Sequence, residues 1–254
     1  TIVVLSVELS EVLAPALVAG VMVALVHAPL GIEVLKRGII FIDLAVAQIA
    51  GLGLVIAHLF FEHPSEVIVQ LAALSSAIVA GLFFRRIERN SPGYQEAIIG
   101  CSFVVAASLT ILALADHPHG GDEMRDLLSG QLLFVTWNDI AIHLPIYVAI
   151  LSIWFLKPGW RSGIAFYLLF SVAVTSSVQL TGVYIVFSSL ILPALAAVNS
   201  PRPHFVAWTV GVLAVVYGIF TAVIFDFPTG PIIVVSFVIS CLSTFMIRKL
   251  SVYK

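Results

Sequence analysis

Apolar residues dominate the chain in long runs that short polar segments separate. The runs lie at 12–34, 39–61, 66–84, 95–115, 139–156, 163–180, 183–199, 205–225 and 231–247. A helix crosses a bilayer with roughly 20 apolar residues, so these runs predict membrane spans. Only Leu180, Thr181 and Gly182 separate the sixth run from the seventh, which leaves a tight hairpin, a broken helix or a kink open. The pattern therefore predicts an all-α, polytopic transmembrane helix bundle of 8–9 spans, with a single transmembrane domain over 1–254.

The composition excludes a soluble protein. Of 254 residues, 61% are hydrophobic and only 10% are charged, and the mean hydropathy is +1.13. Soluble domains carry about 25% charged residues. The chain has no nucleotide-binding phosphate loop, no serine-hydrolase elbow and no zinc-protease helix, so we expect no enzyme and no cofactor in this chain. Nothing indicates a nucleic-acid partner, and uphill transport would need a partner or an ion gradient.

The basic residues divide unequally between alternate connections. One set holds Lys36, Arg37, Arg85, Arg86, Arg89, Lys157, Arg161, Arg202, Arg248, Lys249 and Lys254, and the other holds only Arg125. Basic residues concentrate in cytoplasmic loops. The split therefore predicts nine crossings, with the C-terminus in the cytoplasm and the N-terminus outside.

Two polar residues at membrane depth stand out in the second run, Asp43 and Gln48. An ionisable group inside a membrane segment usually marks a pathway or a contact inside the bundle. Five helical residues place the two side chains about 140° apart, so they could line two sides of one crevice. Asp43 could also pair with Lys36 or Arg37, which lie just before it. His27 in the first run is either a hydrogen-bonded interior histidine or a ligand.

Further candidate residues lie near the ends of the runs. Glu96 opens the fourth run, where an acid complements the helix dipole. The connections opposite the basic set collect most acidic residues and, in or near them, the histidines His58, His63, His117, His119 and His143. Such a face would attract cations; alternatively, the acids lie there only because the basic residues do not. In the segment DHPHGGDE, His117, His119 and Asp122 could bind a divalent metal or belong to a solvated turn. The apolar stretch LLSGQLLFVTW after it is too short to span, so it is predicted to re-enter or to lie along the bundle rim.

Five segments, in order along the chain, carry a family resemblance. They are APLGIEVLKRGIIFIDLAVAQIAGLG (28–53), QEAIIGCSF (95–103), RDLLSGQLLFVTWNDI (125–140), LTGVYIVFSSLILPALAA (180–197) and DFPTGPIIVV (226–235). With these segments the chain resembles the permease subunit of bacterial ABC transporters for zinc, manganese and iron, the ABC-3 family. The last two segments are the most specific in combination.

The resemblance implies partners and a substrate. It implies a homodimer, or part of a larger membrane complex, in the bilayer of the bacterial inner membrane. A separate ATP-binding cassette subunit would supply ATP hydrolysis, and an extracytoplasmic metal-binding protein would deliver a divalent metal as substrate. On matching positions, the acid of the family's path corresponds to Asp43, and the acid at the start of its fourth span corresponds to Glu96.

Two departures from the family pattern stand out. Gln48 replaces a histidine five residues after the acid, and an amide oxygen favours a harder ion than zinc. The connection Leu156–Gly163 is only LKPGWRSG, where the family has a longer loop that grips the ATPase. These departures keep open a non-pumping membrane scaffold or accessory subunit as an alternative. An ion-gradient transporter is a third hypothesis, supported by Asp43 alone.

Overall fold

The computed structural model describes residues 2–61, 64–115, 128, 130 and 132–252, and these residues are helical almost throughout. The α-helices are α1 (Ile2–Arg37), α2 (Ile42–Phe60), α3 (Glu66–Asn90), α4 (Gln95–Leu114), α6 (Trp137–Leu156), α7 (Gly163–Thr181), α8 (Val183–Ala196), α9 (Pro203–Phe225) and α10 (Thr229–Val252). Short 3₁₀ helices lie at η1 (Pro92–Tyr94), η2 (Leu132–Phe134) and η3 (Pro158–Arg161). The prediction of an all-α bundle is confirmed.

Within the described ranges, eight of the helices are long and apolar enough to cross a membrane. The exception is α8, with 14 residues, which measures about 21 Å at helical rise. A bilayer's hydrocarbon core is about 30 Å thick, so α8 is a partial crossing. The predicted eight or nine spans thus become eight long helices and one short one.

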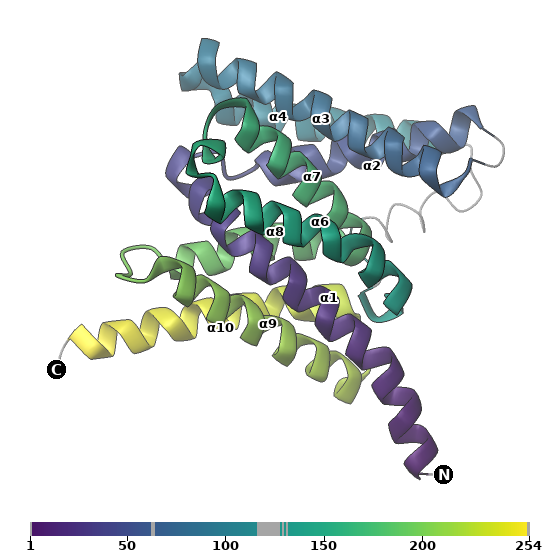
Figure 1. Ribbon diagram of the computed structural model, residues 1–254, viewed down its shortest axis with the longest axis vertical. Coiled ribbons are helices and arrows are strands. Elements are labelled where there is room, and N and C mark those ends of the chain that lie inside the picture. The colour runs from purple at the N-terminus through teal and green to yellow at the C-terminus, as the bar shows by residue number, and fades with distance from the viewer. Residues whose placement is uncertain (1, 62–63, 116–127, 129, 131, 253–254) are drawn as a thin grey trace.

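The helices pack in successive groups (Figure 1). α2, α3 and α4 pack together on one flank, and α9 and α10 pack together on the other. Between these flanks, α7 packs on α3, while α1 contacts α6, α8 and α9. α8 also packs on α9 and α10, so α1 and α8 together join the central group to the α9–α10 flank.

Gly182 makes the tight hairpin that was one of three possibilities for the connection between α7 and α8. Ser177 before it and Ser189 after it both bond to the imidazole of His27. In one continuous helix these serines would be about 18 Å apart, too far for one side chain to reach both. Gly182 has φ 79° and ψ 164°, a backbone conformation that is open essentially to glycine only.

The basic segments that the sequence assigned to one side do meet at one end of the bundle. The Arg37 guanidinium lies 3.1 Å from a carboxylate oxygen of Glu88 and donates to the carbonyl of Arg161 at 2.7 Å. At the α8–α9 connection, Arg248 donates to the carbonyl of Asn199 at 2.8 Å. α8 thus returns the chain to the basic end, as nine traverses require. The side of the membrane that this end faces stays a prediction.

Close approach between α1 and α8 depends on Gly31. A Cβ at this position would overlap the carbonyl oxygen of Leu190 and lie 3.2 Å from the Cβ of Ala194. Small residues allow helix backbones to approach in this way. Since α8 also carries Ser189, this contact sets how the α7–α8 hairpin lies against α1.

Candidate functional site

Asp43 lies in the first turn of α2 and is fully buried. Neither of its carboxylate oxygens has a hydrogen-bond partner among the described residues, and it makes no ion pair there, because Arg37 pairs with Glu33 and Glu88 instead. The alternative in which Asp43 pairs with the basic residues before it is therefore wrong. An acid in the first turn is stabilised by the helix dipole, but a buried carboxylate without a partner is costly.

Glu96 is close to Asp43 because it caps the helix that carries Asp43. The N-cap residue of α2, Phe41, has no side-chain cap of its own, and its N–H donates to Oε1 of Glu96 at 3.2 Å. Glu96 comes from the first turn of α4, so it satisfies an orphan donor of a neighbouring helix. Its second oxygen, Oε2, is buried without a partner. The two carboxylates converge on the start of α2 and leave three oxygens without hydrogen bonds.

Gln48 is also buried, with its amide oxygen and nitrogen both unpartnered. It therefore makes no hydrogen bond to Asp43 in the described structure, and the two side chains lie about 140° apart around the helix. Across the described ranges, no three or more His, Cys, Asp or Glu side chains gather closely enough to hold a metal ion. The structure brings Asp43 and Glu96 to one helix end, and Gln48 contributes buried polar atoms deeper in the same helix.

The outer-loop candidates His117, His119 and Asp122 lie outside the described residues. The rim segment that follows them is partly described. Leu132 in η2 is buried, η2 packs on α1, and Gly130 lies directly against the carbonyl of Thr181. These described residues therefore lie against the turn between α7 and α8 and against α1.

A second polar cluster occupies the middle of the bundle, around His27. Its Nδ1 lies 2.7 Å from Ser189 Oγ and its Nε2 lies 2.9 Å from Ser177 Oγ. The Tyr147 hydroxyl lies 2.8 Å from the same Ser177 oxygen. These residues come from α1, α8, α7 and α6, so one imidazole connects four helices. His27 is a satisfied interior histidine, the first of its two alternatives.

The hydrogen bonds of this cluster fix the direction of each donor. Ser189 gives its hydroxyl hydrogen to the carbonyl of Val186, so it accepts from His27 Nδ1–H. The other ring nitrogen, Nε2, is then the acceptor, because a neutral imidazole has one of each. Ser177 donates to it and accepts from Tyr147. The tautomer is assigned from the network, which on the Ser189 side ends at the carbonyl of Val186.

His143 differs from its predicted place on an acidic outer face. It is buried on α6, and its Nδ1 lies 2.7 Å from Ser176 Oγ on α7. Sequence reasoning missed its partners and those of His27. The available signal was the pair of double serines, at 176–177 and 188–189, on either side of Gly182. Hydroxyls repeated symmetrically about a turn in apolar helices indicate a shared polar interior.

Residues 9–162 and 161–248 match the ABC 3 transport family. The chain belongs to that family. It is accordingly a membrane subunit of an ABC-type transporter and not the subunit that carries catalysis. The family match covers nearly all of the described bundle, including α2, α4 and the α7–α8 hairpin.

Two relatives and one solved structure are similar to this chain. The manganese transport system membrane protein MntC of Halalkalibacterium halodurans is 24% identical over 246 residues, covering 86% of this chain and 81% of its own. The high-affinity zinc uptake system membrane protein ZnuB of Haemophilus influenzae is 24% identical over 250 residues, covering 89% and 93%. The structure of PsaBC from Streptococcus pneumoniae in complex with Fab has a TM-score of 0.74 at 21% identity and 96% coverage of both chains. The last likeness establishes the fold.

Proposed function

We propose that this ABC 3 family chain is the permease of an importer for a divalent metal ion, and that manganese suits it better than zinc. The observation that carries the proposal is the Asp43 carboxylate, which is fully buried and has no hydrogen-bond partner in the described part of the chain. An ionisable group at such a place in a membrane protein is a functional-site candidate. The names of MntC and ZnuB, manganese and zinc systems, support the substrate class.

The choice of manganese comes from the donor atoms. The unpartnered buried ligand atoms on α2 and α4 are oxygens of Asp43, Gln48 and Glu96. Carboxylate and amide oxygens suit manganese and magnesium, whereas imidazole and thiolate suit zinc. Asp43 and Glu96 would serve as anionic ligands on the path, and Gln48 as a neutral oxygen ligand further along α2.

The partners follow from the family and from the charge distribution. We place an ATP-binding cassette subunit at the basic end, which would be cytoplasmic under the positive-inside rule. An extracytoplasmic metal-binding protein would dock at the opposite end. A second copy of this chain would complete the permease, with the whole chain as one domain in the inner membrane.

The competing function is a scaffold that no longer pumps. It is favoured by the short connection between α6 and α7, where only η3 lies between the two spans. An ATPase has little to grip at that point. The two functions differ in whether ATP hydrolysis by a partner depends on this chain and on its buried acid.

The test is uptake by the reconstituted complex. The chain is co-expressed with a candidate ATP-binding cassette subunit, placed in proteoliposomes, and supplied with radioactive manganese or zinc. Asp43→Asn removes one anionic ligand at constant shape. Losing a charged partner costs about 1.5–3 kcal/mol, so apparent manganese affinity should fall at least about tenfold.

Glu66→Gln is the matched control, because Glu66 is an exposed acid in the first turn of α3. It should behave as wild type. Uptake by wild type that Asp43→Asn leaves unchanged would remove Asp43 from the path. A preparation in which no ATPase associates with the chain would support the scaffold instead.

A further inference from the structure

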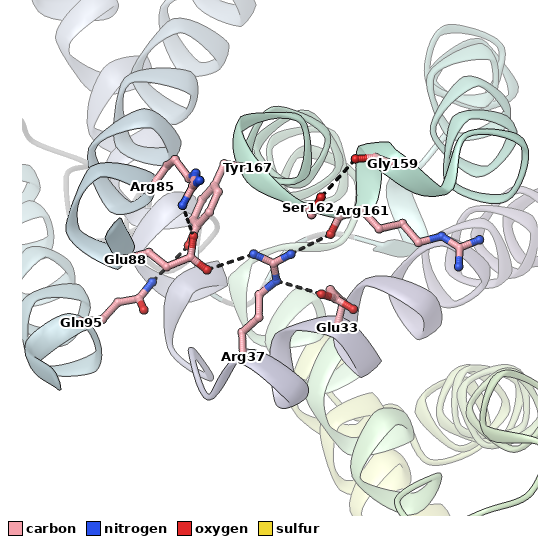
Figure 2. Close-up of polar contacts among 9 residues, drawn as sticks. All are labelled: Glu33, Arg37, Arg85, Glu88, Gln95, Gly159, Arg161, Ser162 and Tyr167. Carbon is pink, nitrogen blue, oxygen red and sulfur yellow. Dashed lines mark hydrogen bonds and ion pairs between the residues drawn. The ribbon is translucent and has the colours of Figure 1, made fainter. Parts of the chain in front are cut away.

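Arg37, the last residue of α1, is held by three acceptors on three separate elements (Figure 2). Its Nε lies 3.0 Å from Glu33 of α1, one terminal nitrogen lies 3.1 Å from Glu88 of α3, and the other donates to the carbonyl of Arg161 in η3 at 2.7 Å. Its guanidinium also lies over the ring of Phe166, 4.0 Å from the centroid. The side chain is only 14% exposed, so these contacts and the surrounding residues restrict it to one position.

The same segment of α7 also holds the start of α4. Tyr167, next to Phe166, accepts a hydrogen bond from the side chain of Gln95 at 3.1 Å, as Figure 2 shows. Gln95 is the first residue of α4 and directly precedes Glu96. The dipeptide Phe166–Tyr167 is therefore a common support for the residue that ends α1 and for the residue that precedes the capping acid.

The chain from Arg37 to α2 is tightly constrained. Gly38 adopts φ 67°, its N–H bonds the carbonyl of Leu35, and the N–H of Ile39 bonds the carbonyl of Val34. These two bonds form a Schellman motif, the usual glycine-terminated helix end. Ile39 is buried as its hydrophobic contact. Few residues are left between the Arg37 anchor and the start of α2 to absorb movement.

The residues that this turn carries are those of the candidate site. Phe41 gives its N–H to Glu96, and Asp43 follows two residues later. We propose that Arg37 is a positioning residue for the Asp43–Glu96 carboxylate pair. This inference rests on the proposed function, in which the pair binds the metal. Arg37 does not touch the pair; it fixes the turn that sets the spacing of the two acids.

The geometry requires arginine and not merely a positive charge. One planar guanidinium serves three acceptors and stacks on Phe166. A lysine ammonium is a compact point charge without the planar fork, so Arg-to-Lys is not conservative at such a place. Arg37→Lys is therefore expected to keep the charge at the basic end and to loosen the turn.

The test compares Arg37→Lys with Arg248→Lys in the reconstituted complex. Arg248 is the matched control because it also anchors this end, donating to the carbonyls of Ala196, Val198 and Asn199, far from the carboxylate pair in the chain. We expect Arg37→Lys to raise the apparent KM for manganese about tenfold, a loss of about 1.4 kcal/mol in binding, with kcat within about twofold of wild type. Arg248→Lys should leave KM unchanged.

A second readout does not need transport. A spin label at Ile40→Cys, in a Cys101→Ser background, reports on the turn itself, since Ile40 is partly exposed. We expect Arg37→Lys to increase its mobility and Arg248→Lys to leave it unchanged. An unchanged label and an unchanged KM in Arg37→Lys would overturn the inference. Mobility that rises while wild type neither binds nor transports manganese would instead overturn the proposed function.

Discussion

Replacing His27 with alanine tests whether the central polar cluster holds the bundle together. The imidazole is fully buried and makes one hydrogen bond to Ser189 and one to Ser177. Alanine removes both bonds and leaves a cavity among α1, α7 and α8. We therefore expect a large loss of stability, although the hydrogen bonds of His27 go to Ser189 and Ser177 and not to Asp43 or Glu96.

The magnitude follows from two contributions. Interhelical hydrogen bonds in membranes are worth about 0.6 kcal/mol each on average, so two bonds give about 1 kcal/mol. Truncation of a large buried side chain to alanine costs about 2–5 kcal/mol through lost packing and the residual cavity. Together we expect His27→Ala to lower the free energy of unfolding by about 3 kcal/mol or more.

A double-mutant cycle identifies the hydrogen-bonded chain. Tyr147→Phe removes only the hydroxyl that bonds Ser177 and should cost about 0.6 kcal/mol. Because Tyr147 and His27 share Ser177 as a partner, their effects should not add. Ser243→Ala is the control, since this exposed hydroxyl bonds only the carbonyl of Ile239 in its own helix.

The assay is unfolding by a denaturing detergent in mixed micelles, followed by tryptophan fluorescence. The free energy of unfolding is compared among wild type, the two single variants, the double variant and the Ser243→Ala control. A His27→Ala cost below about 1 kcal/mol, or strictly additive effects with Tyr147→Phe, would refute the four-helix connection.

Three further changes test separate features. Gly31→Ala should lower the free energy of unfolding by about 1–3 kcal/mol, because the added methyl group overpacks against α8. Gly159→Ala is the control and should not, because the space around its Cβ position is open. Equal thermal stability of the two variants would contradict the close approach of α1 and α8. Glu96→Gln keeps an oxygen that accepts from the Phe41 N–H but removes the negative charge. The free energy of unfolding should therefore stay within about 0.5 kcal/mol of wild type, while manganese affinity falls. Unchanged uptake would mean that Glu96 only caps α2. Ser162→Cys should react with an impermeant maleimide from the cytoplasm, and labelling from outside would reverse the topology.

The sequence predicted the helices well because membrane spans are encoded locally. Each of the nine apolar runs became a helix, and most boundaries agree within a few residues. The N-terminal end of α1, at Ile2, lies well before the predicted start at 12. The hairpin at Gly182 stayed one of three possibilities, since a glycine permits a reversal without requiring one. What decided it was a partner, His27, that lies about 150 residues away in the chain.

Whether each buried polar residue finds a hydrogen-bond partner was not predictable either, because those partners also lie far away in the chain. His27 and Asp43 look alike in the sequence, as ionisable residues in the two apolar runs on either side of the basic pair Lys36 and Arg37. His143 looked like an outer-face residue because it lies six residues into its helix. The partners that settle these assignments come from other helices, and one sequence does not show which helices touch.

The structure instead separates the buried polar residues by whether their hydrogen bonds are satisfied. The cluster of His27, Tyr147, Ser177 and Ser189 is satisfied, and Ser177 and Ser189 leave the His27 ring no free nitrogen. The cluster on α2 and α4 is not, since the side chains of Asp43 and Gln48 have no hydrogen-bond partners among the described residues. In hydrocarbon each unsatisfied polar group costs several kcal/mol. A satisfied network can be kept for stability alone, whereas an unsatisfied acid lowers stability and is best explained by a ligand. Transport should therefore depend on the buried polar residues of α2 and α4. The His27 cluster should instead stabilise the position of the α7–α8 hairpin.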